Sequence, residues 1–139
     1  PRSTLFPYTT LFRSVAGREF FTALAVLKAI YLAHQVGETL NLQRLLHESD
    51  LDLEEVEDVL DRLSEVNWVG STEGGGWILS RSAEVIKVAD VYRVFVFDPD
   101  QKSTARNMED TCAGTLLAGL TTGINKALGM PLKDLFSTG

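Results

Sequence analysis

The stretch DLEEVEDVLDRLSEVNWVGSTEGGGWILSR, residues 52–81, decides the fold. Its first half has apolar residues at helical spacing: Val56, Val59, Leu60 and Leu63. Asp52 with Glu55 three positions later predicts the N-cap and capping box of this helix. Two strand-like segments, NWVGST and GWILSR, follow, and the glycines between them tolerate the positive φ of a tight hairpin. A helix followed by such a hairpin predicts the second half of a winged helix-turn-helix.

Two further helices are expected before this stretch. The first runs from Gly17 to Val36 and stops near Gly37. Its predicted buried face is formed by Phe20, Phe21, Leu24, Leu27, Ile30, Tyr31 and Ala33. A short helix follows with Asn41 as its N-cap. Three helices and a hairpin predict a winged-helix domain over residues 15–97.

The remaining sequence predicts a helical extension over residues 98–139. Ser82 is expected to cap a helix that runs to Val96, and Pro99 marks a break. An amphipathic helix is expected over residues 104–128, followed by a short helix in PLKDLFS. The apolar stripe of the helix over residues 104–128 consists of Met108, Cys112, Leu116, Leu117, Leu120 and Ile124. This stripe predicts either core packing against the first helix or a homodimer contact. The fold class is mostly α (α+β), a winged helix-turn-helix with a two-stranded wing and a C-terminal helical extension.

The composition indicates a soluble globular fragment with 139 residues, of which 45% are hydrophobic. The longest apolar run, Phe20 to Ala33, contains Lys28 and is shorter than the roughly 20 residues of a membrane-spanning helix. Cys112 is the single cysteine, so one chain forms no disulfide framework. The net charge of −6 disfavours nucleic acid as a partner.

The first residues differ in character from the rest. The segment TLFPYTTLFRS, Thr4 to Ser14, resembles the translation of a sequencing-adapter oligonucleotide. Residues 1–14 are therefore expected to be a non-native, disordered leader, which implies that a truncated protein begins near Val15.

The run GGGWILSRSAEVIKVADVYRVFVF, Gly74 to Phe97, resembles the C-terminal cytoplasmic region of the YihY family of bacterial inner-membrane proteins, long labelled ribonuclease BN. The resemblance covers most of residues 17–137. The matching positions are Gly76, Trp77, Leu79, Arg81, Ala89, Asp90 and Tyr92. It implies that transmembrane helices precede this domain in the full-length protein, and that the domain lies at the cytoplasmic face of the inner membrane.

The chain also resembles the IscR-like winged-helix regulators. Tyr31–Ala33, Gly75–Arg81 and Ile86–Val91 match their outline. Members of that family with an iron–sulfur cluster have three closely spaced cysteines after the wing, whereas this chain has only Cys112. The resemblance therefore implies, as the alternative, a cytosolic transcription regulator without a cluster.

The third helix argues against DNA binding. Between Asp50 and Glu65 the sequence has eight acidic residues, and Arg62 is its only basic residue. A helix that enters the major groove needs cations or amides, and like charges repel the phosphates. Glu54, Glu57, Asp58 and Asp61 are the candidate interaction face, either as a solvated surface or as a docking surface for a basic partner.

No catalytic constellation is evident in the sequence. His34 and His47 lie on different predicted helices, without metal-ligand spacing. The glycines Gly74–Gly76 precede a strand and not the Lys-Ser and helix of a phosphate loop. Acidic neighbours favour a buried structural thiol at Cys112. We therefore expect no enzyme activity, no cofactor and no metal. The predicted function is a non-catalytic interaction or regulatory domain, with a protein partner, a sister domain or a second copy as its partner.

Overall fold

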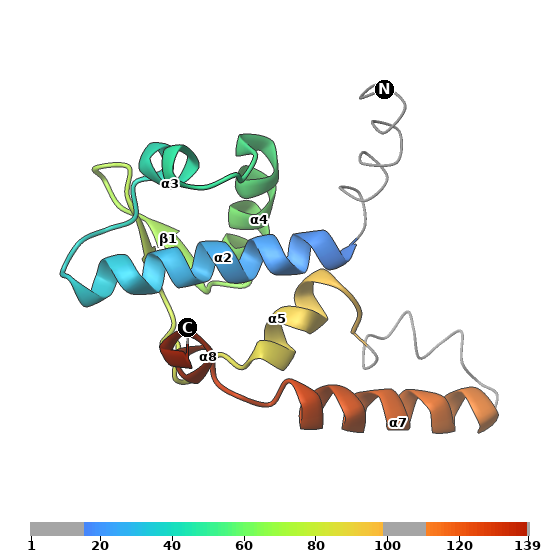
Figure 1. Cartoon of the computed structure of the whole chain (residues 1–139). Coiled ribbons are helices and arrows are strands. Elements are labelled where there is room, and N and C mark those ends of the chain that lie inside the picture. Colours follow the sequence, from blue (N-terminus) through green and yellow to red (C-terminus); the bar gives the residue numbers. More distant parts are fainter. Residues whose placement is uncertain (1–15, 99–110, 139) are drawn as a thin grey trace. The chain divides into compact units, whose positions relative to one another are not determined.

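The computed structural model describes residues 16–98 and 111–138. It consists of two compact units that meet in the sequence between Ala83 and Glu84. Figure 1 shows the helices and strands of each unit. The predicted leader, Pro99 and Met108 lie outside the described residues. The predicted domain limits, 15–97 and 98–139, stay a prediction. The boundary between the two compact units lies within the first predicted domain, after Ala83.

The first unit has the predicted order of three helices and a hairpin. Its elements are α2 (Ala16–Gln35), α3 (Leu42–Glu48), α4 (Leu53–Glu65), β1 (Val69–Ser71) and β2 (Trp77–Leu79). Helix α2 packs against α4 and β2, and α4 also contacts β1. The core of this unit therefore lies between the long first helix, the third helix and the hairpin.

Helix α2 ends as predicted at Gly37, in a Schellman motif. The Glu38 N–H donates to the Ala33 carbonyl at 2.9 Å, and the Gly37 N–H donates to the His34 carbonyl at 3.0 Å. Gly37 has a φ of 75°, a left-handed conformation that glycine adopts without a steric penalty. The sequence therefore correctly placed the end of the helix.

The predicted buried face of α2 is partly wrong. The buried hydrophobic residues are Phe20, Ala23, Val26, Leu27 and Ile30. Phe21 is 69% exposed, although it was expected in the core. Ala23 and Val26, which were not in the predicted stripe, are buried, so the buried side of α2 differs from that stripe. The apolar residues around α2 are too numerous for the pattern to select the buried side.

Helix α4 has the predicted apolar face, since Val56, Val59, Leu60 and Leu63 are all buried. Asp52 is its N-cap residue, but its side chain makes no capping hydrogen bond. The predicted capping box is therefore wrong. The Glu55 carboxylate instead accepts a hydrogen bond from Nε of Arg18 at 2.8 Å. This link between α2 and α4 explains why Glu55 is not directed to its own N-cap.

The hairpin is the predicted antiparallel wing, in which Val69 pairs with Leu79 and Ser71 with Trp77. Gly75 has a φ of 83° at its tip. The Trp77 backbone also exchanges two hydrogen bonds of 3.0 Å with Leu40, which precedes α3. The wing is therefore anchored to the segment between α2 and α3.

The second unit contains three described helices, α5 (Val88–Phe95), α7 (Thr111–Ala127) and α8 (Leu132–Thr138). The predicted start of α5 at Ser82 is wrong, because Lys87 is the N-cap. The residues just before α5 are paired with the segment before α8 instead. The Val88 N–H donates to the Met130 carbonyl at 3.0 Å, and the Leu132 N–H donates to the Ile86 carbonyl at 2.8 Å.

The last two helices agree with the prediction where they are described. Helix α7 occupies the described part of the helix expected over residues 104–128, and α8 covers most of the short helix expected in PLKDLFS. Ile124 of α7 and Leu132 and Phe136 of α8 are buried. The other buried apolar residues of this unit include Ile86, Val88 and Val91, in the segment that contains α5. Together these residues form the core of the second unit.

Candidate interaction surfaces

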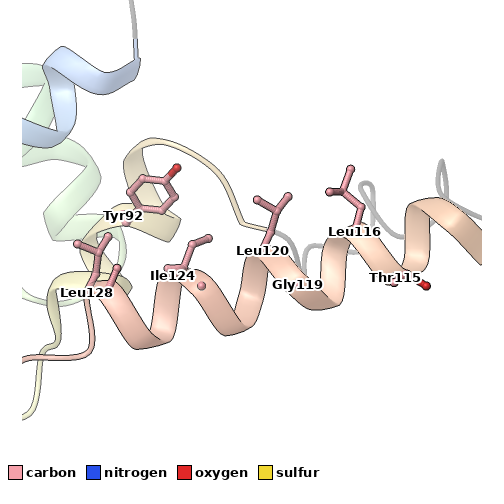
Figure 2. Close-up of a pocket in the computed structure, with 9 residues that line it drawn as sticks. Tyr92, Thr115, Leu116, Gly119, Leu120, Ile124 and Leu128 are labelled. Atoms are coloured by element: carbon pink, nitrogen blue, oxygen red, sulfur yellow. The ribbon is translucent and has the colours of Figure 1, made fainter.

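One side of α7 is apolar and open. Leu116 is 62% exposed and Leu120 is 41% exposed, whereas Ile124 is buried. Figure 2 shows these three side chains projecting from one side of α7, the side on which Tyr92 of α5 lies. A second row, at the same spacing, consists of small residues: Thr115, Gly119, Gly123 and Ala127. Both rows line a groove of about 640 Å³.

This groove bears on the two interpretations of the tail stripe. Met108 and the side chain of Cys112 lie outside the described residues, and Leu117 is half-buried. Leu116 and Leu120 are exposed, so they do not lie in the core of the second unit. Packing of the stripe against α2 stays a prediction, because α2 belongs to the other unit.

The acidic face of α4 is exposed to solvent. Glu54, Glu57, Asp58 and Asp61 are all exposed, and they alternate with the four buried apolar residues of the same helix. Within residues 16–98 and 111–138, none of these four carboxylates has an ion-pair partner. The structure therefore gathers the four residues of the predicted interaction face on the solvent side of the third helix of the winged fold.

The cations beside α4 are engaged with carboxylates on the neighbouring helix. Arg62, the one basic residue of α4, lies 3.4 Å from a carboxylate oxygen of Glu19 on α2. Arg18 of α2 lies 2.8 Å from Glu55, whose side chain is only 15% exposed. These two pairs join α2 to α4. Neither cation is therefore available to offset the charge of the outer face.

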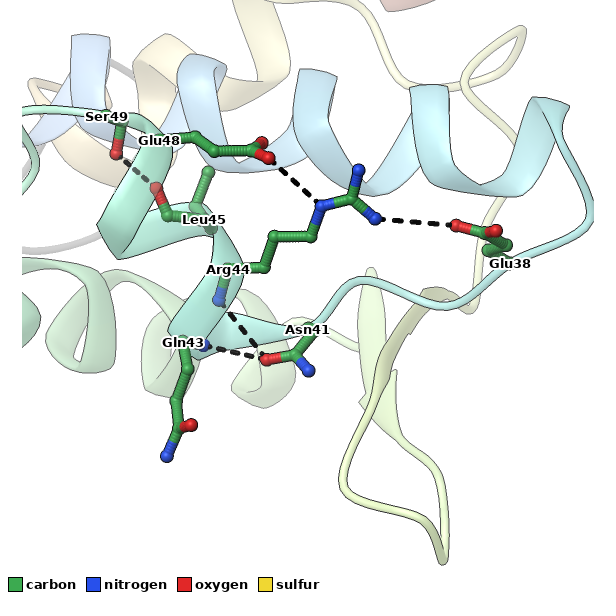
Figure 3. Close-up of polar contacts among 7 residues, drawn as sticks. All are labelled: Glu38, Asn41, Gln43, Arg44, Leu45, Glu48 and Ser49. Atoms are coloured by element: carbon green, nitrogen blue, oxygen red, sulfur yellow. Dashed lines mark hydrogen bonds and ion pairs between the residues drawn. The ribbon is translucent and has the colours of Figure 1, made fainter.

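Helix α3 is fixed by a local polar network, shown in Figure 3. The Asn41 side-chain oxygen accepts hydrogen bonds from the Gln43 N–H at 2.9 Å and the Arg44 N–H at 3.3 Å, as its predicted N-cap role requires. The Arg44 guanidinium lies 3.1 Å from Glu48 and 3.9 Å from Glu38. Its hydrogen bond with Glu48, then the two negative charges, raise the pKa of Arg44. A third cation of this unit is thus neutralised by acids.

The wing residues of the family pattern have structural roles. Gly76 is buried, and a Cβ at this position would collide with the Oγ1 of Thr39 and lie 2.6 Å from its Cβ. Trp77 forms the bridge to Leu40 described above, and Leu79 pairs with Val69. Arg81 is exposed just after β2. Three of these four positions therefore fix the wing, and Glu73 stays exposed at its tip.

The pattern residues of α5 lie in the second unit. Ala89 is buried, and its N–H donates to the Leu128 carbonyl at 2.7 Å. The Asp90 carboxylate accepts from the Lys87 N–H at 3.0 Å and lies 3.5 Å from Arg93. The guanidinium of Arg93 in turn donates to the side-chain oxygen of Asn125 on α7. Tyr92 lines the α7 groove. The pattern thus marks the join between α5 and α7.

The histidines do not form a site. His34 and His47 are exposed on α2 and α3. Across the described ranges, no group of three or more His, Cys, Asp or Glu side chains is arranged to hold a metal ion. The expected lack of enzyme activity, cofactor and metal stays a prediction.

Sequence comparison finds relatives of this chain that are named membrane proteins. A UPF0761 membrane protein of Nitrosospira multiformis is 33% identical over 123 residues, covering 88% of this chain and 28% of that protein. One from Chromobacterium violaceum is 33% identical over 109 residues, 78% of this chain and 26% of that protein. The chain is a homologue of part of the UPF0761 membrane proteins. The predicted resemblance to the YihY family is thereby confirmed.

A third UPF0761 membrane protein, from Aromatoleum aromaticum, is 29% identical over 98% of this chain and 33% of its own length. The chain thus spans between about a quarter and a third of the length of these relatives. No family model matches it. Within residues 16–98 and 111–138, none of the helices is long and apolar enough to cross a bilayer.

Solved structures similar to the chain confirm its fold class. CymR of Staphylococcus aureus has a TM-score of 0.62 at 20% identity, covering 86% of this chain and 95% of its own. IscR of T. potens has a TM-score of 0.62 at 21% identity, covering 90% and 85%. CymR of B. subtilis, a global cysteine regulator, has a TM-score of 0.54 at 21% identity, covering 89% and 94%. The predicted winged helix with a two-stranded wing and a helical extension is correct.

Sequence reasoning missed two features of these surfaces. The groove needs Tyr92, which the sequence assigned only to the family pattern, together with Gly119 and Gly123 of α7. The repeated four-residue spacing of small side chains was the available signal. The contact of Gly76 with Thr39 had no signal, because the two residues lie 37 positions apart in sequence.

Proposed function

We propose that this chain is a non-catalytic interaction or regulatory domain of a YihY-like inner-membrane protein, located on the cytoplasmic side. Its α4 face docks a basic protein segment or a sister domain. The single observation that supports this is the exposed row of carboxylates on the helix that winged-helix DNA-binding proteins place in the major groove. The relatives' name, membrane protein, supports the cellular setting.

The charge distribution explains why a basic partner is favoured. The four carboxylates lie on one helical face, so their potentials add, and no described cation is paired with them. A polyanion brought to this face is repelled, whereas a segment rich in Lys and Arg gains electrostatic attraction and a faster association rate. Such attraction weakens as salt screens the charges.

A fluorescence-anisotropy titration at low salt tests the proposal. Two probes are compared with the full chain: an arginine-rich peptide and a DNA duplex of mixed sequence. The peptide is expected to bind with a Kd that rises with salt, and the duplex is expected to show no saturable binding. Tight, steeply salt-dependent duplex binding, or no peptide binding at any salt concentration, would overturn the proposal.

A pair of matched variants separates a specific face from net charge. Glu57→Gln combined with Asp61→Asn removes two charges from the α4 face. Asp50→Asn combined with Glu73→Gln removes two exposed charges that lie off that helix. We expect the first variant to raise the peptide Kd about tenfold and the second to raise it much less. Equal effects would mean that the peptide responds to overall charge and not to α4.

A second candidate function is a winged-helix transcription regulator without an iron–sulfur cluster. The observation that favours it is the similarity to CymR and IscR, which extends over 85% or more of both regulators. Fold similarity at this identity does not carry DNA reading with it. The duplex arm of the titration distinguishes this candidate directly.

A further inference from the structure

Helix α3 packs incompletely against the end of α2. None of the seven residues of α3 is buried, and its three leucines, Leu42, Leu45 and Leu46, are only half-buried. At the end of α2, Leu32 is 48% exposed and Val36 is 70% exposed. The chain from the last turns of α2 to α3 lines a pocket of about 310 Å³. This volume lies at the lower end of the range for ligand pockets, so the pocket has room for one large side chain.

Most of the lining of this pocket is apolar. Leu32 and Val36 lie at the end of α2, and Leu45 belongs to α3. Leu40 also lines the pocket and is held in place by its two backbone hydrogen bonds with Trp77. An apolar side chain that enters the pocket removes the exposed parts of Leu32 and Val36 from water, which is favourable.

The rim of the pocket has more negative than positive charge. Figure 3 shows the Arg44 guanidinium between Glu48 of α3 and Glu38 of the segment after α2. Of the described residues that line the pocket, Arg44 is the only basic one. Glu48 is the last residue of α3, and Glu38 lies in the turn that ends α2. The C-terminal end of a helix has a partial negative charge, so both carboxylates lie where negative charge is disfavoured. One guanidinium does not offset two carboxylates and two helix ends, and the rim therefore attracts a further cation.

We propose that the pocket between α2 and α3 binds a segment of a protein partner in which a large apolar side chain lies beside an arginine or lysine. The apolar side chain fills the pocket, and the cation binds at Glu38 and Glu48. Leu32 and Val36 continue the apolar surface outside the pocket, which favours a polypeptide segment over a small ligand. The pocket includes none of the exposed carboxylates of α4, and the proposal does not depend on the function proposed for that face.

NMR titrations of the full 139-residue chain with three short peptides test this proposal. The first peptide is Ser-Gly-Phe-Arg-Gly-Ser, the second has serine in place of phenylalanine, and the third has glutamine in place of arginine. The first is expected to bind saturably and to shift the amide signals of Leu32, Val36 and Leu45. Its Kd should be at least about tenfold lower than that of either other peptide, because each of those lacks one of the two contacts.

Two variants with matched controls locate the contact. Glu48→Gln removes a rim carboxylate and should raise the Kd of the first peptide about tenfold. Glu65→Gln should leave it unchanged, because Glu65 is likewise an exposed acid at the end of a helix but does not line the pocket. Val36→Ser removes apolar lining and should raise the Kd about three- to tenfold. Val85→Ser changes an exposed valine of the other unit and should have no effect.

A reversal of charge preference provides a further test. Glu38→Gln combined with Glu48→Gln leaves Arg44 as the only charged residue that lines the pocket. This double variant should bind a peptide with glutamate in place of arginine and should reject the original peptide. Such a reversal requires a folded pocket, so it also excludes unfolding as the cause of the lost binding.

Several outcomes would overturn the proposal. They are the absence of saturable binding by the first peptide, equal binding of the peptide without phenylalanine, and equal effects of Glu48→Gln and Glu65→Gln. Glu57→Gln combined with Asp61→Asn should leave the Kd of the first peptide unchanged. A loss of binding in that variant would mean that the peptide contacts α4 and not the pocket. Failure of this site and failure of the α4 proposal are therefore separately visible.

Discussion

Replacing Gly76 with alanine tests how the wing is joined to the rest of the first unit. The new Cβ would collide with the Oγ1 of Thr39, lie 2.6 Å from the Thr39 Cβ and lie 3.3 Å from the Oγ1 of Thr72. Thr39 has little freedom to retreat, because Leu40 is held to Trp77 by two backbone hydrogen bonds. Overpacking of this kind costs about 1–3 kcal/mol, which lowers Tm by about 3–12 °C for a chain of this size.

A second substitution, at Thr39, should relieve the collision. Thr39→Ala removes the hydroxyl but keeps the Cβ at 2.6 Å, so it should restore only part of the lost stability. Thr39→Gly removes both atoms and should restore most of it, measured relative to the Thr39→Gly single variant. A double-mutant cycle therefore yields a coupling free energy close to the cost of Gly76→Ala itself.

The neighbouring glycines provide controls within the same turn. Gly75 has open space for a Cβ but a φ of 83°, so alanine costs about 1–2 kcal/mol through backbone strain that no change at Thr39 relieves. Gly74 has open space and no positive φ. Gly74→Ala is therefore expected to be neutral or to stabilise by up to about 1 kcal/mol through the unfolded state.

Urea unfolding followed by tryptophan fluorescence measures these free energies, since Trp68 and Trp77 both lie in or beside the hairpin. The expected order of cost is Gly76→Ala first, Gly75→Ala second and Gly74→Ala last. Wild-type stability of Gly76→Ala would refute the close contact with Thr39. A loss that Thr39→Gly fails to restore would place the cause of the loss elsewhere.

Three further predictions concern polar contacts. Asn41→Ala removes the α3 cap and should cost about 1 kcal/mol in urea unfolding, whereas Asn41→Asp keeps an acceptor and should cost less. Arg18→Met leaves the mostly buried Glu55 carboxylate unpaired; we expect a loss of about 1–3 kcal/mol, and an unchanged midpoint would contradict the role of this pair. The Lys133 hydrogen bond lowers the pKa of Glu84, so this pair contributes to stability above the ordinary carboxyl pKa and is lost as pH falls through the lowered one. Lys133→Gln should return the Glu84 pKa towards its ordinary range in a carboxyl NMR titration, and an unaltered titration would rule out the contact.

The parts of the fold that could be predicted are those set by local patterns. Helix α4 separates its apolar and charged residues cleanly, so its buried face followed from spacing alone. The caps at Asn41 and Gly37 followed from side-chain chemistry within a few residues. The positive φ at Gly75 likewise reflects a local demand of the hairpin. Each of these features depends on contacts between near neighbours in sequence.

The errors arose where distant residues compete with local signals. Ser82 has the chemistry of an N-cap, but the backbone at Ile86–Val88 is held by the segment before α8, so α5 begins only at Val88. Glu55 has the spacing of a capping box, but Arg18 offers a charged partner 37 positions away. A local pattern contains no information about such partners, and a bond between two charged groups outweighs one in which only the carboxylate is charged.

The candidate surfaces were predictable to different degrees. The four carboxylates of the α4 face are visible in the sequence because burial of one helical stripe directs the remaining residues to solvent. The α7 groove was not, since its lining includes Tyr92 of another helix and glycines whose significance depends on the open space beside them. Composition identifies a charged face, whereas a groove is a property of the folded arrangement.

The buried and the exposed residues of α4 contribute separately to the fold and to the surface. Its buried residues, such as Val56 and Leu60, help to fill the core of a fold that CymR and IscR share with this chain at only about 20% identity. Its exposed residues, such as Glu57 and Asp61, contribute nothing to that core and are free to differ. The similarity of the folds is thus independent of the charge that the third helix presents. Because a major-groove contact depends on the exposed set alone, the acids of α4 weigh more in assigning a function than the shared fold does.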